Sequence, residues 1–148
     1  GRGTSLNETM ERVLPLVRHE LELDKIELVQ RVPGGLPNLH ADKRHLEEIL
    51  FNLIVNACQA MKETGGRIEF EATQSSGTVQ IKVRDNGPGI PENMLSKVFQ
   101  PFYTTKDEGT GLGLYITKQL VERNGGKISV SSKLNQGTLF RLEFKTVP

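Results

Sequence analysis

Helix and strand periodicities alternate along this chain, and each of two β-hairpin patterns directly follows a helix pattern. The helix patterns cover residues 6–18, 42–62 and 110–123. The strand patterns cover residues 25–29, 67–73, 78–84, 127–132 and 138–145. Helices separated by hairpins predict an α+β fold. We expect a two-layer α/β sandwich with a mixed, mostly antiparallel sheet and its helices on one face.

The length of 148 residues suits one domain, which we place at residues 6–148. Residues 1–5 are interpreted as a flexible or artificial lead. A loop-rich stretch follows residue 85, and its part from about 91 to 110 is expected to be a lid, because so long a connection within one domain is usually functional or disordered. We find no internal repeat.

Charge and composition exclude several classes of protein. The 19 basic and 18 acidic residues leave a net charge of +1, so we expect no nucleic-acid partner. The lone Cys58 excludes an internal disulfide and predicts a reducing, cytoplasmic compartment. Apolar runs fall far below the ~18 residues that span a bilayer, so we expect no membrane contact by this domain. Membrane anchoring of the full-length protein is left open.

A row of polar side chains follows one face of the helix pattern at 42–62. At about 100° per residue, Glu48, Asn52, Asn56 and Gln59 share one sector of this helix. A solvated face is the simpler interpretation, but Asn is a poorer helix former than Lys, Glu or Gln. Amide oxygens beside a carboxylate suit a hard cation such as Mg²⁺ that also binds phosphates.

Two glycine-containing loops lie after this helix. The segment 85–90 places Asp85 at a strand end, followed by glycines that let a flat ligand approach, although a simple turn explains it equally well. The segment 109–114 opens a helix, which makes it a candidate anion site. Its alternate glycines match neither the dinucleotide fingerprint nor the Walker A loop.

Taken together, these motifs resemble the four sequence boxes of sensor histidine kinases. They are Glu48-x-x-x-Asn52-x-x-x-Asn56, Asp85-x-Gly87-x-Gly89-Ile90, Phe99-x-x-Phe102 and Gly109-Thr110-Gly111-Leu112-Gly113-Leu114. Pro101 to Lys106 looks closest to the lid of the nitrogen-regulator-like branch. The resemblance implies the Bergerat ATP-binding fold shared with gyrase B, Hsp90 and MutL, and the activity of a protein histidine kinase in a two-component system.

The resemblance also assigns roles to single residues. It implies that Asp85 binds the adenine amino group, with Gly87, Gly89, Ile90 and Thr138 around the base. Asn56 and Asn52 would hold Mg²⁺, and Glu48, Asn52 and Lys106 would be catalytic. The remaining nucleotide contacts would come from Phe102, Thr105, Lys106 and residues Gly109, Thr110, Gly111, Leu112, Gly113 and Leu114. Ala60 departs from members with an aromatic residue near adenine, so base stacking is expected to be weaker or to come from the lid.

The chain departs from a complete kinase in its phosphoacceptor. His19-Glu20 lacks the proline that follows the family's acceptor histidine, and His40 and His45 are expected to be structural or solvated. We therefore expect the acceptor on a separate dimerisation domain, a response regulator downstream, a monomeric fragment and a homodimeric full kinase. Two alternatives stay open, namely an ATPase that drives conformational change and a nucleotide-binding regulatory module.

Overall fold

Five strands form one sheet in the computed structural model, which describes residues 2–102 and 112–148. The strands are β1 (Ile26–Arg31), β2 (Gly66–Ser75), β3 (Thr78–Asp85), β4 (Lys127–Lys133) and β5 (Gly137–Lys145). Their spatial order is β1-β2-β3-β5-β4. Only the β1–β2 pairing is parallel, and the three other pairings are antiparallel. The expected mixed, mostly antiparallel sheet is confirmed.

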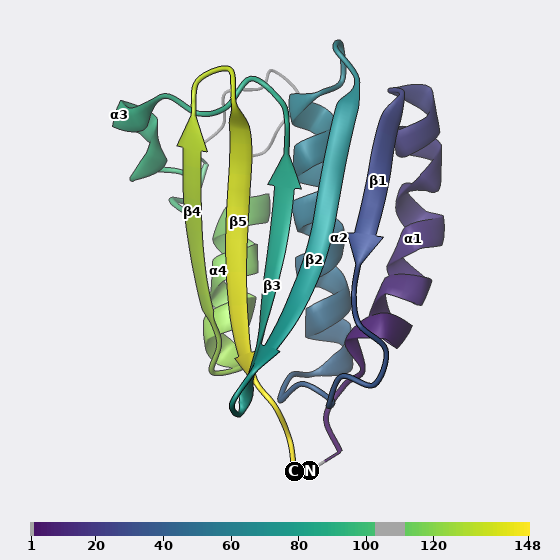
Figure 1. Cartoon of the computed structure of the whole chain (residues 1–148). Coiled ribbons are helices and arrows are strands. Elements are labelled where there is room, and N and C mark those ends of the chain that lie inside the picture. Colours follow the sequence, from purple (N-terminus) through teal and green to yellow (C-terminus); the bar gives the residue numbers. More distant parts are fainter. Residues whose placement is uncertain (1, 103–111) are drawn as a thin grey trace.

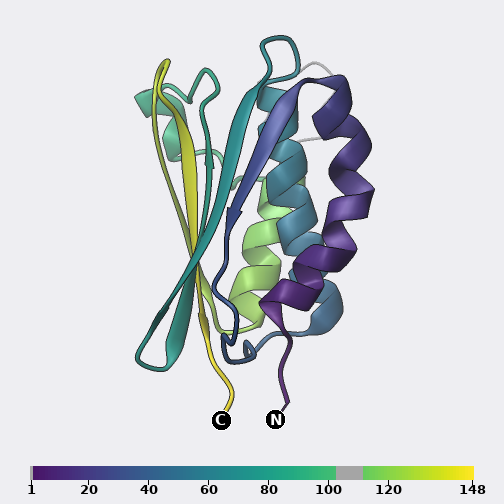
Figure 2. The ribbon, with the colours of Figure 1, turned by 45° about the vertical axis from the view of Figure 1, so that its right-hand side comes forward.

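Three long helices cover one face of this sheet (Figure 1). They are α1 (Leu6–Leu23), α2 (Lys43–Ala60) and α4 (Gly113–Arg123), whereas the short α3 (Glu92–Leu95) lies beside the β4 edge. The view along the layers shows helices on one side and an uncovered sheet face on the other (Figure 2). The two-layer α+β sandwich is therefore confirmed, and α1 extends five residues beyond the predicted end at residue 18.

Side-chain caps explain where two of the long helices begin. The Ser5 hydroxyl accepts a hydrogen bond from the backbone N–H of Glu8, and the Asp42 carboxylate accepts one from the N–H of His45 at 3.0 Å. Such caps satisfy donors that have no partner within the helix. The bond from His45 also holds the pKa of Asp42 below its ordinary value of 3.8. The N-cap predicted at residue 42 is confirmed.

The core lies between the sheet and the helices, and α2 contributes most to it. Its buried residues face β2, β3 and the flanking helices, and they are Leu46, Ile49, Leu50, Leu53, Ile54, Ala57 and Cys58. Truncating one such leucine to alanine costs about 2–5 kcal/mol in comparable cores. Burial raises the pKa of the Cys58 thiol to about 11. The interpretation of Cys58 as a small buried hydrophobe is confirmed.

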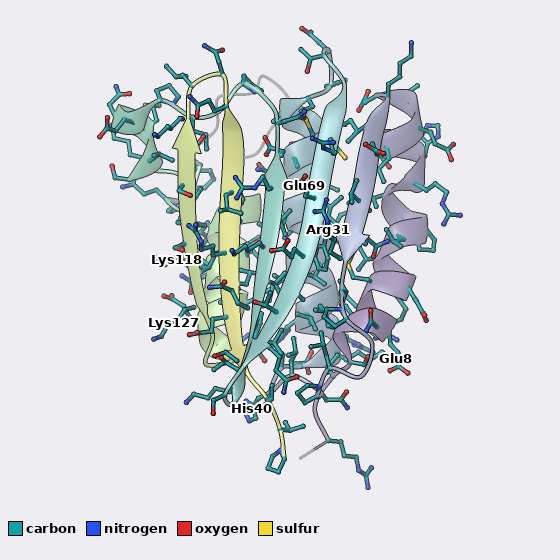
Figure 3. All side chains as sticks on the ribbon, viewed as in Figure 1. Glu8, Arg31, His40, Glu69, Lys118 and Lys127 are labelled. Carbon is teal, nitrogen blue, oxygen red and sulfur yellow. The ribbon has the colours of Figure 1, made fainter. Side chains whose placement is uncertain are left out.

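The uncovered face of the sheet is charged. The Glu69 carboxylate on β2 lies 3.9 Å from the guanidinium of Arg31, 3.7 Å from that of Arg67 and 3.9 Å from that of Arg84. Figure 3 shows Arg31 and Glu69 on this side, away from the helices. These arginine side chains are about half exposed, so each pair contributes at most about 1 kcal/mol. This face stays in water because its strands alternate apolar and charged residues.

The expectation of a flexible lead over residues 1–5 is wrong for its last residues. Thr4 is buried, its backbone pairs with that of Leu39, and its hydroxyl donates to the carbonyl oxygen of Ala41 at 2.7 Å. Leu39 in turn pairs with Thr146 near the other end of the chain. Sequence composition could not predict this, because the partners of Thr4 lie more than 30 residues away. Within the described residues, no helix has the length and hydropathy to cross a membrane.

Candidate functional site

The segments that carry the sequence motifs meet at one end of the fold. The end of β3, the C-terminal end of α2 and the start of β5 lie together at the end opposite the two chain termini (Figure 1). Gly87, two residues after β3, lies against the end of α2, since a Cβ placed on it would be 3.1 Å from Cγ of Met61 and 3.8 Å from Cβ of Ala60. Residues 85–90 therefore close over the last turn of α2.

Asp85 is a buried acidic group at this end, and the loop after β3 is hydrogen-bonded to it. Its side chain is only 5% exposed, and Oδ1 accepts a hydrogen bond from the N–H of Gly87 at 2.9 Å. The following Asn86 extends the pairing with β2, because its N–H donates to the carbonyl of Arg67 and its Oδ1 accepts from the N–H of Arg67 at 2.7 Å. Asn86 thus continues the hydrogen bonding to β2 beyond the end of β3. The sequence analysis did not predict this role.

Two glycines bring this loop close to the β4–β5 turn. Gly89 has a φ of +78°, and a Cβ on it would overlap the backbone carbonyl oxygen of Lys133. Gly137 has a φ of +93°, and its Cβ would overlap the carbonyl oxygen of Asp85. Both positions combine a left-handed backbone with close approach, which only glycine tolerates. The structure therefore gives Gly89 a packing role, and its predicted contact with a base stays a prediction.

Three polar side chains form a row across the sheet at this end. Asp85 on β3 pairs in register with Thr138 on β5, and Thr138 pairs with Ser132 on β4. Thr138 is 7% exposed, and its Oγ1 lies 2.9 Å from Oγ of Ser132. The Ser132 hydroxyl also accepts from the N–H of Ile90 at 2.8 Å. The sequence analysis missed Ser132, because only the register between β4 and β5 shows that it stands beside Thr138.

One residue in the polar row of α2, Asn52, contacts α4. Asn52 is half-buried, and its Nδ2 donates to Oγ1 of Thr117 at 3.4 Å, while the Thr117 hydroxyl donates to the carbonyl of Gly113 at 2.8 Å. Because Thr117 donates its one proton to Gly113, it can only accept from Asn52. This fixes the orientation of the Asn52 amide and directs its Oδ1 away from Thr117.

The other members of this row differ in exposure. Glu48 and Gln59 are exposed, and Asn56 is half-buried. Ala60, which lies next to the row at the end of α2, is also half-buried. Among the described residues there is no group of three His, Cys, Asp or Glu side chains that could hold a metal ion. The groups in this row that could bind a metal ion are therefore the amide oxygens of Asn52 and Asn56 and the carboxylate of Glu48. Such a set suits Mg²⁺ that keeps several waters and shares its other positions with phosphates, so the residues fit this cation.

The aromatic residues before the undescribed segment have different environments. Phe99 packs edge-on against Phe140 with ring centroids 6.1 Å apart, and the Lys118 ammonium lies 5.3 Å from the Phe99 ring centre. Phe99 and the buried Val98 thus anchor this stretch to β5 and α4. Phe102 is 75% exposed, and its expected contact with the nucleotide stays a prediction.

The second glycine loop is only partly described. Leu112 is the N-cap of α4, Gly113 is its first residue and Leu114 is half-buried, so the helix begins three residues later than predicted. The predicted phosphate-binding residues Thr105, Lys106, Gly109, Thr110 and Gly111 lie outside the described residues. Of the expected site, the structure brings together the α2 row, the start of α4, residues 85–90 and Thr138.

Comparisons with known proteins agree with this arrangement. Residues 41–148 match the family described as histidine kinase-, DNA gyrase B- and HSP90-like ATPase. The sensor histidine kinase ZraS of Escherichia coli K12 is 38% identical over 141 residues, which cover 95% of this chain and 30% of ZraS. The chain thus spans less than a third of that relative.

Solved structures show the same fold. The nucleotide-free catalytic domain of the histidine kinase ThkA superposes with a TM-score of 0.85 at 32% identity, covering 98% of this chain and 97% of that one. Full-length ShkA in complex with AMPPNP gives a TM-score of 0.82 at 29% identity over 98% of this chain and 31% of that chain. ThkA with its response regulator TrrA gives 0.81 at 29% identity, over 97% of this chain and 41% of that one. The chain therefore belongs to the histidine kinase-, DNA gyrase B- and HSP90-like ATPase family, in the form of the catalytic domain of sensor histidine kinases.

Proposed function

We propose that this domain binds Mg²⁺·ATP and transfers the γ-phosphate to a histidine on a phosphoacceptor and dimerisation domain outside this chain. One observation carries the proposal. A buried carboxylate at the end of β3 begins a loop that packs against the C-terminal end of α2 at Gly87, and Asn52 in the polar row of α2 contacts α4. With the base at Asp85, the cation at the polar row of α2 and the phosphates at the start of α4, the three proposed sites would follow the order of the parts of a nucleotide.

The base would bind at Asp85. A carboxylate is an acceptor only, so it suits the exocyclic amino group of adenine, and its burial strengthens the bond. Gly87 and Gly89 carry no side chains that would block a planar base. Ile90 and Ala60 would make apolar contacts with the base. Thr138 stands beside Asp85 and would take part through a bridging water. The AMPPNP complex of ShkA supports a nucleotide in this family's domain.

Asn52 and Asn56 would hold the cation through their amide oxygens. The bond from Asn52 Nδ2 to Thr117 supports this role, since it leaves Oδ1 as the group that faces away from α4. A bound Mg²⁺ supplies charge neutralisation for the phosphates. Glu48, which lies one turn before Asn52 and is exposed, would take a proton from the incoming nucleophile.

The phosphates would be held at the start of α4 and by the segment before it. The helix N-terminus formed by Leu112, Gly113 and Leu114 offers backbone N–H groups and the positive end of the helix dipole. Lys106, Thr105, Phe102 and residues 109–111 are proposed to complete the contacts from the lid. Phosphoryl transfer asks for positioning and charge stabilisation more than for covalent chemistry, which this division of roles provides.

The partners follow from the same proposal. The acceptor histidine would come from the kinase's own dimerisation domain, because His19-Glu20 lacks the proline that follows the family's acceptor histidine. We further propose a homodimeric full kinase in the nitrogen-regulator-like branch, working in the cytoplasm and passing its phosphate to a response regulator. The solved complex of ThkA with TrrA supports such a regulator. This domain would be monomeric by itself and would contact neither nucleic acid nor membrane.

A phosphotransfer assay tests the proposal. Radiolabelled ATP and Mg²⁺ are mixed with this chain and the phosphoacceptor domain of the same kinase, and acid-labile, base-stable phosphate on the acceptor is measured. We expect labelling that is lost in Asp85→Asn and kept in Glu143→Gln, a matched carboxylate-to-amide change on the uncovered sheet face. Rapid ATP hydrolysis with an unlabelled acceptor would favour an ATPase. Nucleotide binding without either activity would favour a regulatory module.

A further inference from the structure

The uncovered face of the sheet is divided by charge. On its β1–β2 side the charges compensate one another, because Glu69 lies near three guanidinium groups. On β3, β5 and β4, where outward side chains alternate with inward ones, Glu143 is the single acidic residue that points outward, and it stands opposite Lys127. The other charged side chains of this half are basic. Four of them form what we call the basic patch: Lys82, Lys127, Arg141 and Lys145.

Arg141 occupies an unfavourable position within this patch. It lies on β5 directly opposite Lys82 on β3, and like charges that face each other across a sheet destabilise it. Lys82 is compensated from its other side, because Glu71 on β2 stands opposite it. Arg141 has Ser129 on its other side instead, and its guanidinium donates to Oγ of Ser131 at 3.3 Å. Among the described residues Arg141 forms no ion pair, so the stability of the sheet gives no reason for an arginine here.

The surface around Arg141 is open to a partner. No long helix covers this side of the sheet (Figure 2). The outward side chains of β4 next to Arg141 are those of Ser129 and Ser131, which are small and exposed. Arg141 and Lys82 are half-buried, so their side chains lose less conformational freedom on binding than fully exposed ones would. The cationic groups are therefore accessible and already partly ordered.

The pattern of charges favours one class of partner. A basic surface attracts acidic groups and speeds their association. The phosphates of a nucleic acid or an anionic membrane would also meet the carboxylates of Glu69, Glu71 and Glu143, which lie on the same face. A folded protein, in contrast, can place its carboxylates against the basic patch alone and keep neutral or basic groups opposite the glutamates.

We propose that the basic patch is a docking surface for a protein partner with an acidic face, and that Arg141 is its central contact. The planar guanidinium of an arginine can bind a carboxylate through two parallel N–H···O bonds, which gives direction as well as attraction. A carboxylate at this place would also relieve the repulsion between Arg141 and Lys82. The inference does not depend on the nucleotide site proposed at Asp85, and its test uses no nucleotide.

The test uses a fluorescein-labelled oligoglutamate peptide as the acidic probe and measures its binding to the whole chain by fluorescence anisotropy at low salt. We expect Arg141→Gln to weaken binding about 3- to 10-fold, as for the loss of one partly exposed charge pair. Lys127→Gln should act in the same direction. Arg18→Gln is the matched control, because it makes the same chemical change at an exposed position on α1, in the helix layer, and it should keep the affinity of the wild type.

Stability gives a second readout, which a purely structural role of Arg141 would move in the other direction. Arg141→Gln removes the repulsion with Lys82, so its denaturant midpoint should equal or exceed that of the wild type while its affinity falls. A lower midpoint would show that Arg141 stabilises the sheet and would overturn the inference. Equal losses of affinity in Arg18→Gln and Arg141→Gln would show attraction by net charge alone, with the same consequence. Tighter, Arg141-dependent binding of oligothymidylate or phosphatidylserine vesicles would exclude a protein as the preferred partner.

Discussion

Replacing Asp85 by asparagine tests the base site with the smallest change of shape. The amide oxygen of the introduced side chain can still accept from the N–H of Gly87, whose bond to the carboxylate is 2.9 Å long, so the loop should keep its conformation. The second oxygen becomes an NH₂ group. A donor then faces the amino group of adenine in a pocket where the side chain is only 5% exposed.

The expected loss is large because the bond involves a charged acceptor. Hydrogen bonds to charged groups contribute about 1.5–3 kcal/mol, which corresponds to a loss of about 10- to 150-fold in ADP affinity. Inosine diphosphate (IDP) should be affected in the opposite direction, since its O6 can accept from the new NH₂ group. The ADP-to-IDP ratio of Asp85→Asn should therefore fall further than the ADP affinity itself.

Calorimetric titrations of both nucleotides without Mg²⁺ measure these quantities, and thermal unfolding shows whether the variant remains folded. Glu143→Gln is the matched control, because it makes the same chemical change on β5 while pointing to the uncovered face. It should bind both nucleotides like the wild type. ADP affinity within about twofold of wild type in Asp85→Asn, where at least ~10-fold is expected, would refute the assignment of Asp85 to the base.

Further predictions concern three parts of the molecule: the cation site, the sheet end and the thiol. Asn56→Ala should reduce phosphotransfer far more than ADP affinity measured without Mg²⁺, and an equal loss in both assays would remove its metal role. Thr117→Val should act in the same direction but more weakly, because it frees the Asn52 amide to rotate; titrations with and without Mg²⁺ check this. Gly137→Ala should destabilise the fold by about 2 kcal/mol or more, since it combines a backbone clash with a positive φ; a denaturant midpoint equal to wild type would contradict this. Cys58, with its pKa raised from 9.0 to about 11, should resist thiol reagents at about pH 8 until the protein unfolds. Its linkage should lower the free energy of unfolding as the pH rises from about 9 to 11, because the unfolded state loses the thiol proton first. A pH-independent stability in Cys58→Ala over this range, compared with a decline in wild type, would support that sign.

Local patterns predicted most of the elements because these elements are amphipathic along most of their length. The helix periodicity placed α2 within about two residues of its observed ends, and the alternation of apolar and polar residues placed both hairpins. The end of α1 was predicted less well, because its last turn packs few apolar residues and its periodicity fades after residue 18. Short-range patterns also missed α3, whose four residues bury no side chain.

The candidate site was predicted in part, and the limits are physical. Asp85 was singled out because it stands at a strand end before two glycines, and the polar row of α2 because asparagine is a poorer helix former than Lys, Glu or Gln. Asn86 and Ser132 were missed because serine and asparagine are ordinary residues of turns and strand ends. Their partners, Arg67 and Thr138, are found only through strand pairing.

The sequence by itself determined the type of each element, the acidic and amide groups available, and the family, because these depend on residue identity and on spacings of a few positions. Only the folded structure shows which group donates and which group accepts in each hydrogen bond of the site. The register of β3, β5 and β4 sets Asp85, Thr138 and Ser132 side by side, and the packing of α2 on α4 orients Asn52 through Thr117. Hydrogen-bond polarity depends on which groups face each other within about 3 Å, and residues far apart in the chain reach that distance only in the folded protein.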